Sequence, residues 1–117
     1  MTWLCPVPFP VTRRTSRVMI EVGAAPGATT IVVRGELDLV TMPFLAEQLA
    51  LVSRDKPGRL VFDLAGTAFM DCGSARLIAG AGQWLPEGRR PVIRRPGPAV
   101  RRILDLTGLD AYCEIEG

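Results

Sequence analysis

The chain has 117 residues, of which 48% are hydrophobic and 22% are charged, and its formal net charge is +2. A chain of this length is expected to fold as one domain that needs neither metals nor disulfides to stabilise its core. Histidine is absent. Its absence excludes the usual Ser-His-Asp and Cys-His catalytic arrangements and histidine-ligated metals. The composition therefore favours a binding domain over an enzyme, with no metal and no cofactor.

Neither a membrane span nor a secretory signal is predicted. No apolar run reaches the roughly 18 residues that span a bilayer, and the N-terminus lacks a basic segment before its apolar residues. The three cysteines (Cys5, Cys72 and Cys113) are too few and too scattered for a secreted disulfide framework. We expect a cytoplasmic protein without membrane insertion. A redox disulfide between Cys72 and Cys113 stays open, because sequence does not give their separation.

The N-terminal third begins with an arm and continues into a hairpin. Residues 1–16 contain three prolines and no periodic pattern, which indicates an extended or mobile arm ahead of a domain formed by residues 17–117. Residues 18–22 and 29–34 are rich in apolar and β-branched side chains, as strands are. A Pro-Gly turn separates them, and so short a connection predicts an antiparallel hairpin.

A helix and a buried strand follow. Thr41 is expected to cap a helix that starts at Met42, where a proline in the first turn is tolerated. This helix is expected to end before Pro57, and residues 59–64 then form a short apolar strand. Such a strand is buried on both faces if it runs parallel to its neighbour.

In the C-terminal half, helices and strands continue to alternate. A second helix is expected to begin near Gly73 and to end before Pro86, and residues 91–94 form a weak strand. Pro98 opens a third helix, which Gly108 ends.

A last strand is expected at residues 112–115. The predicted order is therefore β-β-α-β-α-β-α-β. This order indicates a single α/β domain with a mixed β-sheet, helices packed on it and right-handed crossovers.

The segment from Phe69 to Ile78 carries the most information. It reads Phe-Met-Asp-Cys-Gly-Ser-Ala-Arg-Leu-Ile, an apolar pair followed by a capping aspartate and a helical pattern. Asp71 is the expected N-cap, and the free N–H groups of the first turn favour negative charge there.

With this segment, residues 35–39 (Gly-Glu-Leu-Asp-Leu), 60–64 and 98–109 resemble a STAS domain of the anti-sigma factor antagonist family, over roughly residues 18–116. The resemblance implies a non-catalytic regulator that binds a kinase-like anti-sigma factor and so releases a sigma factor for transcription. In that family the anti-sigma factor ends the contact by phosphorylating the antagonist. A phosphoryl group adds about −1.5 to −2 charge and so weakens docking. The alternative is a STAS subunit of a lipid-transport or stressosome-type complex. A monomer or a weak homodimer is expected.

The family pattern at the phosphorylation site is Asp-Ser-Ser-Gly, with the second serine as acceptor. Here Asp71 matches the aspartate, Cys72 the first serine and Gly73 the acceptor, while Ser74 stands at the family's glycine. One step along a helix turns a side chain by about 100°. We therefore expect phosphorylation to be absent or inefficient, with Ser74 as the possible displaced acceptor.

The expected partner-binding surface combines two segments of the resemblance. Asp38 matches the aspartate of the family's Gly-Glu-Leu-Asp segment, and Arg76 lies on the exposed side of the second helix. The full expected set is Asp38, Thr41, Asp71, Cys72, Gly73, Ser74 and Arg76.

Six of the 14 basic residues fall between positions 89 and 102. No aromatic residue between Trp84 and Tyr112 is present to stack on bases, which argues against nucleic acid as a ligand. A solvated basic surface and a surface for an acidic protein partner both fit this cluster.

Overall fold

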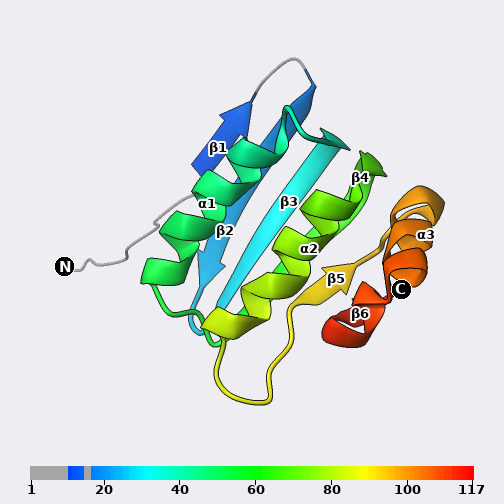
Figure 1. The fold of residues 1–117 in the computed structure, drawn as a ribbon. Coiled ribbons are helices and arrows are strands. Elements are labelled where there is room, and N and C mark those ends of the chain that lie inside the picture. Colours follow the sequence, from blue (N-terminus) through cyan, green and yellow to red (C-terminus); the bar gives the residue numbers. More distant parts are fainter. Residues whose placement is uncertain (1–10, 15–16) are drawn as a thin grey trace.

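The computed structural model describes residues 11–14 and 17–117, which form a single six-stranded sheet covered by helices (Figure 1). The strands are β1 (Val11–Arg14), β2 (Val18–Ala25), β3 (Ala28–Leu37), β4 (Arg59–Met70), β5 (Val92–Arg94) and β6 (Glu114–Glu116). The helices are α1 (Met42–Arg54), α2 (Cys72–Gly80) and α3 (Pro98–Thr107), with short 3-10 segments at Ala81–Trp84 and Leu109–Tyr112. No helix in the described ranges is long and apolar enough to cross a membrane.

The spatial order of the strands equals their order in the sequence. β1, β2 and β3 pair antiparallel, whereas β3, β4, β5 and β6 pair parallel. Each parallel step needs a crossover connection, and α1, α2 and α3 supply the three crossovers. As a result, the carboxyl ends of β3 and β4 lie together at one end of the sheet, where α1 and α2 begin (Figure 1).

One apolar core joins the sheet to its helices. Alternate residues of β2 and β3 are buried, as the period of a strand requires. The central strand β4 is buried from Leu60 to Leu64, as expected for a parallel strand inside the sheet. The largest fully buried side chains are Ile20, Ile31, Leu37, Leu45, Leu49, Leu60, Phe62, Leu64, Met70, Ile78, Ile93 and Leu104.

The predicted α/β class and element order are confirmed from β2 onward, with three differences in detail. β1 lies inside the stretch that we expected to be an arm. Residues 1–10 and 15–16 of that stretch lie outside the described residues. The sequence gives no alternating pattern for β1, because a strand of four residues is too short to show one.

The second difference is the length of β4. The apolar pattern predicts a strand that ends at Leu64, whereas β4 runs to Met70. Its second half lacks a continuous apolar run and pairs with β3 across two register shifts. The hydroxyl of Thr67 donates to the Val33 carbonyl at 2.9 Å and helps hold this part against β3. Pairing to a neighbour, rather than local apolarity, therefore maintains the strand.

The third difference is at the C-terminus. The strand expected at residues 112–115 begins two residues later, as β6, because a 3-10 turn occupies Leu109–Tyr112.

Gly35 gives a test of this strand geometry. Its φ is +108°, and a Cβ built there would overlap the carbonyl oxygen of Arg17. Gly35→Ala should therefore lower the free energy of unfolding by at least about 2 kcal/mol. Gly23→Ala is the matched control, since Gly23 has ordinary backbone angles and open space around it. Urea unfolding of both variants measures the difference, and equal stability would contradict the described backbone.

Candidate protein-binding site

The candidate site lies where β3 and β4 end side by side. Leu37 and Met70, the last residues of the two strands, are register partners. The backbone N–H of Asp71 donates to the Leu37 carbonyl at 2.9 Å, which extends the pairing past Met70. The segments that begin at Asp38 and Asp71 therefore leave the sheet as neighbours. We call the surface formed by residues 38–41 and 71–76 the strand-end site.

Asp38 organises the loop between β3 and α1. Its Oδ1 accepts the backbone N–H groups of Val40 at 2.9 Å and Thr41 at 3.0 Å. Its own N–H donates to the Thr41 hydroxyl at 2.9 Å, and that hydroxyl donates to the Glu36 carbonyl at 2.6 Å. Local hydrogen bonds of this kind stabilise a tight turn without regular structure.

Thr41 occupies the N-cap position of α1, as predicted, but its hydroxyl does not cap the helix. The prediction of a threonine cap is wrong because the hydroxyl bonds back into the loop instead. The side chain is also buried, with 1% exposed, so its observed role is to shape the loop, and its contact with a partner stays a prediction.

The side chain of Arg17, the residue before β2, contacts Asp38 from outside the loop. Arg17 forms ion pairs with Glu36 at 2.7 Å and with the Oδ2 of Asp38. The pKa of Asp38 is lowered, first by the hydrogen bond from the Thr41 backbone, and also by the Val40 backbone and the Arg17 charge. Asp38 is therefore a carboxylate at neutral pH.

The start of α2 forms the other half of the site. Asp71 has extended backbone angles, and its Oδ1 accepts the Ser74 N–H at 2.8 Å, so the predicted N-cap is confirmed. Cys72, Gly73 and Arg76 are exposed. Cys72 and Arg76 are four residues apart and lie on one helix face.

Ser74 departs from the expected role. Its side chain is fully buried, and its Oγ has no hydrogen-bond partner among the described residues. A buried hydroxyl can neither contact a partner protein nor reach a kinase in this conformation. This burial argues against including Ser74 in the binding surface, and that assignment stays a prediction. Ser74 is buried because α2 begins at Cys72, which turns Ser74, the third residue of the helix, toward the core.

The strand-end site also presents apolar side chains that sequence analysis did not select. Leu39 is 79% exposed and Val40 is 66% exposed, both at the tip of the loop that Asp38 holds. Exposed aliphatic groups on an ordered loop, rimmed by charged side chains, are typical of protein-binding surfaces. Leu39 belongs to the Gly-Glu-Leu-Asp-Leu segment of residues 35–39, but the sequence of this segment does not show which of its side chains are exposed. The sequence does not predict the contact of Arg17 with Asp38, because the two residues are 21 positions apart.

The two described cysteines are free thiols at different ends of β4. Cys72 follows the end of this strand, whereas Cys113 lines the same hollow as Gly58 and Arg59, which lie at the start of β4. Twelve strand residues span roughly 35 Å, far beyond the reach of a disulfide. Burial, followed by the charge of Asp110, raises the pKa of Cys113 to about 11. Cys113 is therefore a protonated core residue.

A mixed sheet with helices over one face and an ordered apolar loop at its strand ends defines a small α/β binding module. Comparison with known proteins agrees with this class. The family model described as "Mlab, STAS domain" matches residues 20–115. The chain belongs to the STAS domain family.

Its relatives include antagonists of anti-sigma factors. The anti-sigma-F factor antagonist RsfB of Mycobacterium tuberculosis is 27% identical over 93 residues, which cover 80% of this chain and 76% of RsfB. The crystal structure of an anti-sigma factor antagonist from Mycobacterium paratuberculosis is 30% identical, with a TM-score of 0.77 and 85% of each chain covered. The unphosphorylated anti-sigma factor antagonist SpoIIAA, at 19% identity and a TM-score of 0.69 over 84% of this chain and 88% of SpoIIAA, shares the fold.

The hydrogen bonds to Asp38 predict its titration. Its carboxyl should titrate below the ordinary aspartate value of about 3.9. Because its pKa is depressed by folding, its stabilising contribution is present above the unfolded pKa and is lost as pH falls through the folded pKa. In Arg17→Ala the midpoint should rise but stay below the ordinary value, since the backbone donors remain. NMR titration of the Asp38 carboxyl carbon measures both, and a midpoint above 3.9 in the parent protein would contradict the loop geometry.

Proposed function

We propose that this chain is a non-catalytic anti-sigma factor antagonist of the cytoplasm, which binds a kinase-like anti-sigma factor through the strand-end site. The relationship to the Mycobacterium paratuberculosis antagonist carries this proposal, because it combines 30% identity with a shared fold over 85% of both chains. The exposed loop at the strand ends supplies the contact surface. In binding the anti-sigma factor, the chain would leave the sigma factor free to direct transcription.

The chemistry of the strand-end site suits a protein partner. Leu39 and Val40 offer apolar area in a loop that is already ordered, so little conformational entropy is lost on docking. Asp38 and Arg76 place opposite charges around this area, and such a polar rim fixes orientation more than it adds affinity. We assign the contact to Asp38, Leu39, Val40, Cys72, Gly73 and Arg76.

Phosphorylation is not the control mechanism that we propose for this chain. Position 73, which corresponds to the family's acceptor, has no hydroxyl, and the hydroxyl of Ser74 is buried. An in-line phosphoryl transfer requires a hydroxyl that reaches the kinase. The chain would then be regulated through its amount, or through competition for its partner.

A matched pair of leucines tests the docking surface. Leu39 is 79% exposed at the strand-end site, and Leu106 is 72% exposed on α3, outside that site. Leu39→Asp should weaken binding to the anti-sigma factor at least tenfold, about 1.4 kcal/mol, because it places a charge in an apolar contact. Leu106→Asp should stay within twofold. Calorimetry with anti-sigma factors of the same genome measures both constants.

Equal losses in the two leucine variants would contradict the site assignment. If the parent protein binds none of these factors, the proposed function itself is wrong. A STAS subunit of a lipid-transport or stressosome-type complex would then be the better description.

Restoring the acceptor hydroxyl tests the account of phosphorylation. A Cβ at position 73 would lie 3.7 Å from the Met42 sulfur and 3.8 Å from an Asp71 carboxylate oxygen, which are ordinary contacts. Gly73→Ser should therefore fold normally and gain one phosphoryl group from the cognate kinase and ATP. The parent protein and Gly80→Ser, a control with an exposed helical hydroxyl, should gain none. Intact mass and site mapping give the result, and rapid phosphorylation of Ser74 in the parent would contradict it.

A further inference from the structure

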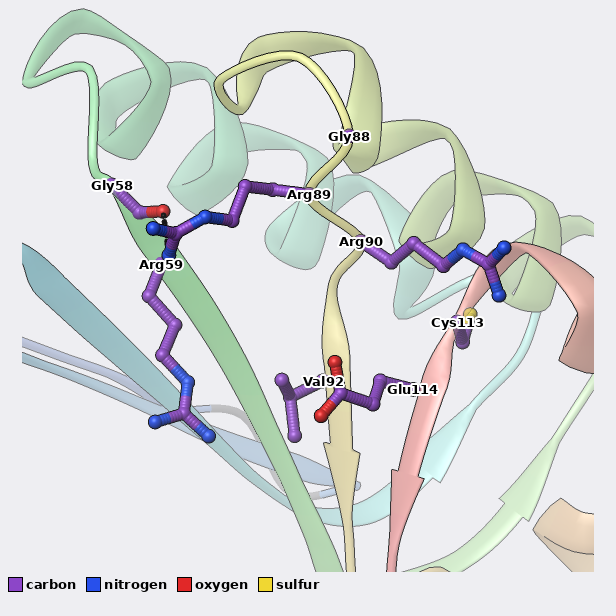
Figure 2. A pocket seen from close by; sticks show the side chains of 8 residues that line it. All are labelled: Gly58, Arg59, Gly88, Arg89, Arg90, Val92, Cys113 and Glu114. Atoms are coloured by element: carbon purple, nitrogen blue, oxygen red, sulfur yellow. Dashed lines mark hydrogen bonds between the residues drawn. The ribbon is translucent and has the colours of Figure 1, made fainter.

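A second concave surface lies at the other end of the sheet. A hollow of about 320 Å³ opens where β4 and β5 begin, roughly 35 Å along β4 from the strand-end site (Figure 2). Its lining residues are Gly58, Arg59, Gly88, Arg89, Arg90, Val92, Cys113 and Glu114. Three of these eight residues are arginines and one is a glutamate, so the charge of the lining is predominantly basic.

The basic cluster of residues 89–102 separates into paired and unpaired arginines. Arg94 forms an ion pair with Glu116 at 3.0 Å, and Arg95 forms one with Asp63 at 2.6 Å. Arg89 and Arg90 are exposed, and neither forms an ion pair with any residue that the structure describes. Two adjacent cations without a carboxylate partner favour an external anion.

A second hollow, of about 520 Å³, adjoins the first and shares Arg89 and Arg90 with it. Its remaining lining residues are Ala79, Gly80, Gly82, Gln83, Ala111 and Tyr112. Tyr112 is 64% exposed and is the one aromatic residue among those that line this hollow. We call the two hollows together the arginine groove. Its lining combines cationic side chains with one exposed aromatic side chain.

We propose that the arginine groove binds an acidic peptide segment of a partner protein, independently of the strand-end site. Figure 2 shows that Arg89 and Arg90 extend in opposite directions, Arg89 toward the Gly58 carbonyl and Arg90 toward Cys113. Two guanidinium groups that point apart suit two carboxylates along an extended chain better than one small anion. An apolar side chain of the same segment would pack on Tyr112.

Nucleic acid fits this groove less well. The Glu114 carboxylate lies within the first hollow, and Asp110 lies close enough to raise the pKa of Cys113. These negative charges interrupt the basic lining that a phosphate backbone would follow. The carboxylates of a peptide are separated by other residues, so they can contact the arginines and stay away from Glu114 and Asp110. Because the two sites lie at different ends of the sheet, the domain could hold two partners together.

Fluorescence anisotropy tests the proposal with the full chain. The probe is a fluorescein-labelled peptide of alternating glutamate and leucine, and its counterpart carries glutamine in place of glutamate. The acidic peptide should bind and the glutamine peptide should bind at least tenfold more weakly. Binding should weaken as salt rises above about 150 mM, because the contact is electrostatic.

Paired variants locate the site. The double variant Arg89→Ala with Arg90→Ala should lose at least tenfold in affinity for the acidic peptide. The control is Arg101→Ala with Arg102→Ala, which removes the same charge from the exposed face of α3 and should change affinity less than twofold. Tyr112→Ala should weaken the glutamate–leucine peptide but leave a peptide of glutamate and glycine unchanged.

Three results would overturn the proposal. Equal losses in both double-arginine variants would indicate attraction to overall charge. Displacement of the peptide by an equimolar amount of inorganic phosphate would indicate a small-anion site. Tighter binding of a single-stranded oligonucleotide than of the acidic peptide would indicate a nucleic-acid surface.

Discussion

The structure depends on the parallel pairing of β3 with β4. This pairing runs from Ala28 beside Arg59 to Leu37 beside Met70 and continues into the hydrogen bond from the Asp71 backbone to the Leu37 carbonyl. Parallel strands bring their carboxyl ends to the same edge, and the crossover helices then start there. Two loops that are distant in the sequence thus become one surface. If β4 lost its register with β3 at its carboxyl end, Asp38 would move away from α2 and the strand-end site would no longer form.

Within that surface, polar groups hold the geometry while apolar groups remain free for contact. The Asp38 carboxylate is occupied by backbone N–H groups and Arg17, and the Asp71 carboxylate by the first turn of α2. Both carboxylates therefore stabilise the backbone of the surface. The exposed loop tip is apolar and ordered by these bonds. An ordered contact surface loses less entropy on association than a flexible one.

Local patterns predicted most of the fold, and pairing between distant segments explains what they missed. The Asp71 cap and the Gly108 helix end could be predicted because each depends on a few adjacent residues. The full length of β4 and the contact of Arg17 with Asp38 could not, because they depend on a neighbouring strand. The burial of Ser74 depends on the residue at which α2 starts, and helix ends are uncertain by one or two residues in any sequence analysis. The family resemblance selected the two segments of the proposed site, whereas the exposure of Leu39 and Val40 required the structure.

The most direct measurement of the central claim is an NMR map of the bound domain. Spectra of ¹⁵N-labelled protein, recorded with and without the anti-sigma factor, report which backbone amides change environment. We expect the largest changes at residues 38–41 and 72–76, with small changes near Arg89 and Arg90. Changes confined to the latter region, with residues 38–41 unaffected, would contradict the assignment of the anti-sigma contact to the strand-end site.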